Sequence, residues 1–197
     1  MRTSRAAGGA LLLSCAGLLL TGCGLEPSTA YVPAADPGSI EPVEGAEDTE
    51  VRVTSKNFTE QLILGKIAVL AMQAAGFETE DITNVPGSQP VRELMLSGDA
   101  DLTFEYTGTA WLTYMGNETG IPDQQEQWEA VREADLENGL TWGQPAALNN
   151  TYALAVRSEY AEANNLETIS DIASLPVAER TFCVESEFNS RSDGLTP

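Results

Sequence analysis

The side chains that could take part in chemistry fall mostly where predicted strands begin or end. They include cationic, aromatic, hydroxyl and amide groups: Lys56, Tyr106, Thr109, Asn150, Tyr152 and Arg191. In a parallel sheet the carboxyl ends of the strands meet at one edge, and ligands bind there. The pattern therefore predicts a binding site for a small polar or charged ligand.

The composition restricts what such a site could do. The chain has no His, which removes the commonest general base and metal ligand, so serine–histidine and cysteine–histidine hydrolases are excluded. Ten Lys and Arg against 30 Asp and Glu give a net charge of −20, which excludes nucleic-acid binding through a basic surface. The length of 197 residues and a hydrophobic content of 42% suffice for a buried core. These features favour a binding protein over an enzyme.

The first 23 residues read as an export signal. Two arginines precede the apolar stretch Ala10–Leu20, which is short of the ~20 residues needed to span a bilayer. The stretch closes on Leu20-Thr21-Gly22-Cys23, which resembles the lipobox of bacterial lipoproteins. We expect residues 1–22 to be a signal peptide. We expect Cys23 to carry a lipid that anchors the protein to the outer side of the cell membrane. Cleavage would leave 175 residues and, by removing two arginines and no acid, a charge of −22.

A polar segment separates this signal from the rest of the chain. Gly24–Glu50 contains four prolines and seven acidic residues, with little apolar periodicity. Such a composition is typical of an extended, disordered linker. We therefore expect an acidic, Pro-rich tether over residues 23–49.

Beyond the tether, segments with strand and helix patterns alternate. Alternating β-branched runs predict strands over residues 51–55, 81–85, 101–106, 152–156 and 181–184. Helices are expected after Asn57, from Ser88, over 107–115, over 122–139, and near Ala161 and Ile169. This order predicts an α/β fold with a largely parallel sheet.

The first of these helices has the clearest signals. Asn57 and Glu60 have the spacing of a capping box, and Gly76 ends the helix. Apolar residues at helical spacing predict its buried face: Leu62, Ile63, Ile67, Leu70, Ala71 and Ala74.

Four other residue types receive structural interpretations. Cys183 lies in a predicted strand and is interpreted as a small buried hydrophobe. The three tryptophans, Trp111, Trp128 and Trp142, are expected at core edges. Asp101 and Glu105 alternate with apolar residues, so they are interpreted as the solvated face of a strand. An enzyme would need these two carboxylates as an acid–base pair.

Four blocks of sequence carry a family resemblance. They are Ser55-Lys56-Asn57-Phe58-Thr59-Glu60-Gln61, Phe104-Glu105-Tyr106-Thr107-Gly108-Thr109, Asn150-Thr151-Tyr152-Ala153-Leu154-Ala155-Val156, and Glu187-Phe188 followed by Arg191 and Asp193-Gly194. In this order they resemble the glycine betaine/choline substrate-binding lipoproteins of osmoprotectant ABC importers, over Glu50–Pro197. The resemblance implies a two-lobed class II periplasmic-binding-protein fold, no cofactor or metal, and an ABC permease in the membrane as partner.

The resemblance also implies roles for individual residues. A trimethylammonium group has no N–H, so it is selected by aromatic faces through cation–π attraction of about 0.5–2 kcal/mol each. Tyr106 and Tyr152 match two walls of the family's aromatic cage. Lys56 and Arg191 match its carboxylate-binding cations, and Thr109 matches its hydroxyl donor. Such a carboxylate clamp would favour betaines over choline.

One site residue departs from the pattern. Asn150 stands where some relatives have an acidic residue, which changes how the bound cation would be oriented. It stays in the predicted site but ranks below the two tyrosines.

The resemblance predicts how the chain divides. The first lobe is expected over residues 50–155, and the start of a second, incomplete lobe over 156–197, because relatives continue past Asp193-Gly194. We therefore expect an amino-terminal portion of such a protein, in which the cage is half formed. The mature form is expected to show no measurable glycine betaine affinity by calorimetry, and a full-length version to bind.

Three alternatives stay open at this point. The protein could bind another polar solute, such as an amino acid, in which case replacing Tyr106 and Tyr152 by Ala would have no effect. It could be an enzyme that uses Asp101 and Glu105. It could also be a truncated, non-functional product.

Overall fold

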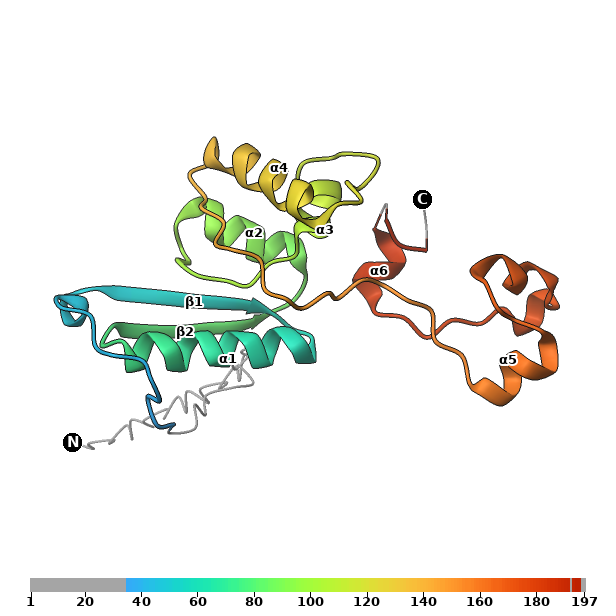
Figure 1. Cartoon of the computed structure of the whole chain (residues 1–197), viewed down its shortest axis with the longest axis horizontal. Coiled ribbons are helices and arrows are strands. Elements are labelled where there is room, and N and C mark those ends of the chain that lie inside the picture. Colours follow the sequence, from blue (N-terminus) through green and yellow to red (C-terminus); the bar gives the residue numbers. More distant parts are fainter. Residues whose placement is uncertain (1–34, 192, 196–197) are drawn as a thin grey trace, which may run out of the picture.

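The computed structural model describes residues 35–191 and 193–195 (Figure 1). The two strands are β1 (Glu50–Lys56) and β2 (Glu78–Val85). The α-helices are α1 (Thr59–Ala74), α2 (Ser88–Ser97), α3 (Thr107–Thr109), α4 (Gln124–Leu136), α5 (Ser158–Asn164) and α6 (Ser186–Ser190). α3 continues into a short π-helix, η2 (Ala110–Tyr114), and there are 3-10 helices at η1 (Ala46–Asp48), η3 (Ile169–Ser174) and η4 (Val177–Glu179). The predicted signal peptide and Cys23 lie outside the described residues. Within the described part of the chain, none of the helices has the length and apolar character needed to cross a membrane.

The sheet is built around β1. β1 and β2 pair in parallel, with α1 as the crossover between them, and Val53 forms an isolated parallel bridge with Leu102 on its other side. The strand expected over residues 101–106 is therefore reduced to one bridge. Beyond Leu102, side chains satisfy the backbone instead of β1: Phe104 O accepts from Gln61 Nε2 at 3.1 Å, and Tyr106 N donates to Glu105 Oε1 at 2.8 Å.

Helix α1 is present as expected, but its details differ. Phe58 is the N-cap and no side chain caps the helix, so the predicted capping box is wrong. The Glu60 carboxylate instead accepts hydrogen bonds from Tyr106 and Asn150. The helix ends as predicted before Gly76, which takes the left-handed conformation at φ 94°.

The buried face of α1 was also predicted wrongly. Its buried residues are Gln61, Gly65, Ala68 and Val69. Ile63 and Ile67, expected inside, are 56% and 52% exposed. The helix is turned so that Gly65 faces the sheet, where a Cβ would lie within 3 Å of Thr83 and Ser55 atoms. Ala68 and Val69 then pack with Val53 in the core.

Helices α2 and α4 form a second layer above the sheet (Figure 1). α2 buries Val91 and Arg92 and ends at Gly98. The Asp123 side chain caps α4 by accepting from the backbone N–H groups of Gln125 and Glu126. The helices expected from Ser88, over 107–115 and over 122–139 are therefore confirmed.

The tryptophans lie at the edges of this layer, as expected. Trp128 is buried and donates to Gly143 O, whereas Trp111 and Trp142 are partly exposed. Trp142 donates to the Asp135 carboxylate and Trp111 to Thr119 O. Each indole N–H thus has a partner although its ring is apolar.

The chain then leaves this layer as an extended segment that runs past α6 to α5, and it returns from there to α6 (Figure 1). α5 and η3 confirm the short helices expected near Ala161 and Ile169. Residues 152–156 and 181–184, predicted as strands, are not in a sheet. An extended segment becomes a strand only when another strand pairs with it, and none of the described strands does so. Cys183 lies on such an unpaired segment and is exposed, so its predicted burial is wrong.

The residues just before β1 pack against the end of α1. Val43 N donates to Ala75 O at 2.9 Å, and Glu78 N donates to Thr49 O at 3.1 Å. Ala46 is buried. The last part of the expected tether, from Val43 to Thr49, is therefore attached to the end of α1 and the start of β2.

Candidate functional site

The end of β1 places Lys56 inside the protein. Its side chain is 2% exposed, and Nζ lies 2.6 Å from Glu105 Oε1 and 5.0 Å from the centre of the Tyr106 ring. Glu105 also accepts from the Tyr114 hydroxyl at 2.7 Å. Burial and the nearby Glu105 carboxylate raise the pKa of Tyr114, which keeps its proton for this bond.

These contacts correct the interpretation of Glu105, whereas the Asp101 side chain is 38% exposed, as expected for a solvated face. Glu105 is largely buried and forms an ion pair with Lys56, so it is not part of a solvated face. Asp101 accepts from Arg52 Nε and Nη2 at 2.9 Å. Each carboxylate is neutralised by its own cation, and the two do not form the pair that acid–base catalysis would need.

Tyr106 is held by residues at the start of α1. Its hydroxyl donates to Glu60 Oε1 at 2.6 Å and accepts from Gln61 Nε2 at 3.1 Å. Burial raises the pKa of Tyr106, and the hydrogen bond to Glu60 adds to the effect. Asn150 Nδ2 donates to the same Glu60 oxygen at 3.0 Å. Glu60 thereby connects Tyr106 with Asn150, which lies 90 residues further along the chain.

Arg191 organises a second group of contacts. Its Nε and Nη2 donate to Asp193 at 2.7 and 2.6 Å. Nη1 donates to the Tyr152 hydroxyl at 3.3 Å, and Nη2 lies 3.5 Å from Thr109 Oγ1. Burial lowers the pKa of Arg191, but the Asp193 carboxylate outweighs burial and the pKa is raised overall.

Tyr152 lies beside this guanidinium on the extended segment. Its ring centre is 5.7 Å from Arg191 Cζ and 4.5 Å from the centre of the Phe188 ring on α6. The side chain is 59% exposed. Burial of part of the ring raises its pKa, and Arg191 opposes this rise.

The two groups meet on α3. Tyr106 is the N-cap of that helix and Thr109 is its last residue. The structure therefore brings all six predicted site residues into one connected set, from β1, α3, the extended segment and the residue after α6.

Sequence reasoning missed the partners that position these side chains. They are Glu60, Gln61, Phe188 and Asp193, together with Glu105, whose role was misread. All five lie inside the four sequence blocks named above. Their position within the blocks was therefore the available signal.

Two hollows lie near the second half of the chain, and none of the six predicted residues lines either. The first, of about 410 Å³, is lined by Asn57, Pro86, Gly87, Glu185, Ser186, Glu187 and Ser190. At its wall both Glu187 carboxylate oxygens lie 3.2 Å from Ser88 N, at the start of α2. A carboxylate at this position satisfies a free N–H and interacts favourably with the helix dipole.

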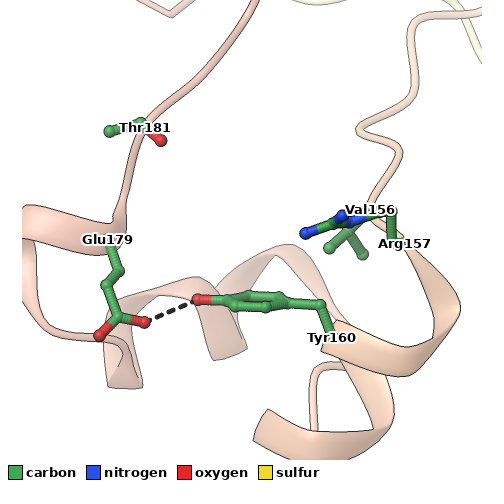
Figure 2. A pocket seen from close by; sticks show the side chains of 5 residues that line it. All are labelled: Val156, Arg157, Tyr160, Glu179 and Thr181. Carbon is green, nitrogen blue, oxygen red and sulfur yellow. Dashed lines mark hydrogen bonds between the residues drawn. The ribbon is translucent and has the colours of Figure 1, made fainter.

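The second hollow, of about 360 Å³, lies beside α5 (Figure 2). Figure 2 shows Tyr160 spanning it to donate to Glu179 Oε2, at 2.9 Å, with Val156, Arg157 and Thr181 around them. This hydrogen bond joins α5 to η4 within the same part of the chain. It has no contact with the six-residue set.

Residues 49–196 match the model of a protein family described as the substrate-binding domain of ABC-type glycine betaine transport systems. The chain belongs to this family. A glycine-betaine-binding protein of Pseudomonas aeruginosa is 33% identical over 160 residues, which are 77% of this chain and 51% of that protein. The glycine betaine-binding protein YehZ of Escherichia coli is 33% identical over 149 residues, which are 74% of this chain and 49% of that protein.

The solved structures agree with this family. Apo YehZ from Escherichia coli superimposes with a TM-score of 0.51 at 32% identity, covering 74% of this chain and 53% of that one. The α/β periplasmic-binding-protein fold expected from the sequence is confirmed. The chain spans about half the length of the curated relatives it matches.

Proposed function

We propose that this chain is the substrate-binding component of an osmoprotectant ABC importer. It binds glycine betaine, choline or a similar quaternary ammonium compound outside the cell and delivers it to a permease in the membrane. It catalyses no reaction. The lipobox supports anchoring through a lipid on Cys23, and residues 50–155 and 156–197 would be the first lobe and the start of the second.

The observation that carries this proposal is the convergence of six family-motif residues from four distant segments. Tyr106 and Tyr152 would form two walls of the cage. Each ring already lies near a cation of the protein, with Lys56 Nζ 5.0 Å from one centre and Arg191 Cζ 5.7 Å from the other. Ring faces that attract these cations can attract a trimethylammonium group in the same way.

The proposed carboxylate clamp consists of Lys56, Arg191 and the Thr109 hydroxyl. Glu105 and Asp193 fix the two cations in place, at 2.6 Å each. A substrate carboxylate would share these cations with the protein's own carboxylates. The free energy that the substrate carboxylate gains from these paired cations is therefore smaller than it would gain from unpaired ones. The aromatic walls then contribute the main selectivity.

The test compares glycine betaine with 3,3-dimethylbutanoate, its carbon analogue, which has the same shape and carboxylate but no positive charge. Saturation-transfer difference NMR on the purified chain detects contact of the ligand methyl groups with the protein even when affinity is weak. We expect a saturable methyl signal for glycine betaine that is at least about threefold stronger than for the analogue, because cation–π attraction needs the charge. Equal signals, or none for glycine betaine, together with the same result for choline against its own carbon analogue, would show that the chain does not recognise quaternary ammonium compounds.

A further inference from the structure

Glu60 is a carboxylate without a cation in the part of the chain that the structure describes. Its Oε1 accepts from two neutral donors, the Tyr106 hydroxyl and the Asn150 amide, at 2.6 and 3.0 Å. None of the ion pairs among the described residues includes it. Its charge is thus directed at the edge of a proposed cage ring and is not neutralised.

The cations of the proposed site are, by contrast, already compensated. Lys56 pairs with Glu105, and Arg191 pairs with Asp193 and lies 3.9 Å from Glu187. With Glu60, the connected set holds two cations and four carboxylates. The site therefore has a net negative charge before a ligand arrives.

We propose that Glu60 is a specificity-determining residue that makes this site prefer net-cationic quaternary ammonium compounds, such as choline, over zwitterionic betaines. The inference rests on the proposed function of the site. Choline presents only a positive charge to Glu60. In glycine betaine the attraction of the ammonium group is opposed by repulsion of the nearby carboxylate, because opposite contributions at similar distances partly cancel.

This preference is the reverse of the one expected from the clamp residues alone. Lys56 and Arg191 would favour a carboxylate if they were unpaired, but Glu105 and Asp193 neutralise them. Asn150 also acquires a role. As an amide it donates to Glu60 and holds the carboxylate toward Tyr106.

The experiment measures the dissociation constants of choline and glycine betaine by saturation-transfer titration of the whole chain and of three variants. Glu60→Gln removes the charge and keeps a hydrogen-bond acceptor. Glu60→Asp keeps the charge. Glu133→Gln, on the exposed face of α4, removes the same charge from a residue outside the proposed site.

We expect the unaltered chain to bind choline more tightly than glycine betaine. Glu60→Gln should weaken choline binding about tenfold and glycine betaine binding about threefold or less, as for a partly screened charge a few ångströms away. Glu60→Asp should keep the preference within about threefold, and Glu133→Gln should leave it unchanged.

Two outcomes would overturn this inference, and they are distinct from failure of the proposed function. Tighter binding of glycine betaine by the unaltered chain, or the same choline-to-betaine ratio in Glu60→Gln, would refute the role of Glu60 while both compounds still bind. If neither compound gives more signal than its carbon analogue, which lacks the ammonium charge, the proposed function itself fails. A backbone amide spectrum of each variant shows whether the fold is intact; if Glu60→Gln is unfolded, the Glu60→Asp result and the preference of the unaltered chain decide.

Discussion

At the scale of single residues, the Asp135 carboxylate on α4 is held by three side chains. It is fully buried and accepts from Arg92 Nη1 at 2.8 Å and from Trp142 Nε1 at 2.6 Å. Asn138 adds a further hydrogen bond at 3.1 Å. Because Arg92 lies on α2, this ion pair connects the two helices of the upper layer.

Replacing Asp135 by Ala should destabilise the fold by about 3–5 kcal/mol, because Arg92 would remain buried without its counter-charge. Chemical denaturation monitored by tryptophan fluorescence measures this loss. Glu133→Ala, an exposed acidic residue on the same helix, should change the free energy of unfolding by less than about 0.5 kcal/mol. Similar values for the two variants would contradict the structural role of the pair.

The same carboxylate predicts a pH dependence. Burial raises the pKa of Asp135, but hydrogen bonds from Arg92, Trp142 and Asn138 outweigh burial and lower it overall. A carboxyl with a lowered folded-state pKa stabilises the fold above its unfolded pKa of about 3.9, and this contribution is lost as pH falls through the folded pKa. Between pH 6 and low pH, the free energy of unfolding should therefore fall less in Asp135→Asn than in the unaltered chain.

At the scale of elements, the contact between α1 and the sheet depends on Gly65. A Cβ at this position would lie 2.8 Å from Thr83 Cγ2 and 2.9 Å from Ser55 Cβ. These distances are shorter than normal van der Waals contacts, so a larger residue would push the helix away from β1 and β2. The position of α1 in turn sets Glu60 and Gln61 against Tyr106.

Gly65→Ala should cost about 1–3 kcal/mol of stability, because the overpacking exceeds the gain in helix propensity of about 1 kcal/mol. Gly108→Ala in α3 is the matched control, since nothing lies within 4 Å of its added Cβ. We expect that change to be neutral or slightly stabilising in thermal unfolding. Stabilisation by Gly65→Ala would contradict the close approach of α1 to the sheet.

The elements were predictable from sequence only where local patterns determine them. The strand over 51–55, the helices α1, α2 and α4 and the end of α1 at Gly76 follow from periodicity and turn residues. The buried face of α1 did not, because Gly65 owes its position to Thr83 on a later strand. The strands expected over 152–156 and 181–184 failed for a related reason: strand formation depends on a partner elsewhere in the chain.

The site was predictable to a similar extent. The six motif residues were identified, and the structure connects them, but their role in ligand binding stays a prediction. Their protein partners depend on contacts such as Lys56–Glu105, 49 residues apart, and Glu60–Asn150, 90 residues apart. Local patterns carry no information about such pairs.

At the scale of the whole molecule, polar contacts attach the second half to the first. Glu187 on α6 binds the N-terminus of α2, Arg191 lies against Thr109, and Asn150 binds Glu60. These contacts surround the proposed site. A change in the position of the second half of the chain relative to the first would therefore change the geometry of the site.

Glu187→Ala should weaken this attachment. The Ser88 amide, which now lies 3.2 Å from both Glu187 oxygens, would lose a hydrogen bond to a charged acceptor, and its hydrogen exchange should accelerate at least about tenfold. Glu162→Ala on α5, whose side chain is exposed, should leave Ser88 exchange unchanged. Unchanged exchange in Glu187→Ala would mean that other contacts hold α6 in place.

The central claim is that Tyr106 and Tyr152 recognise a quaternary ammonium group, and replacing these rings tests it most directly. Saturation-transfer titrations with choline and glycine betaine would compare the unaltered chain with Tyr106→Ala, Tyr152→Ala and, as controls that keep the ring, Tyr106→Phe and Tyr152→Phe. The account predicts that each Ala variant weakens binding by at least about threefold and that each Phe variant retains most of it. Equal binding in the unaltered chain and both Ala variants would contradict the tyrosine cage and favour a site for another polar solute.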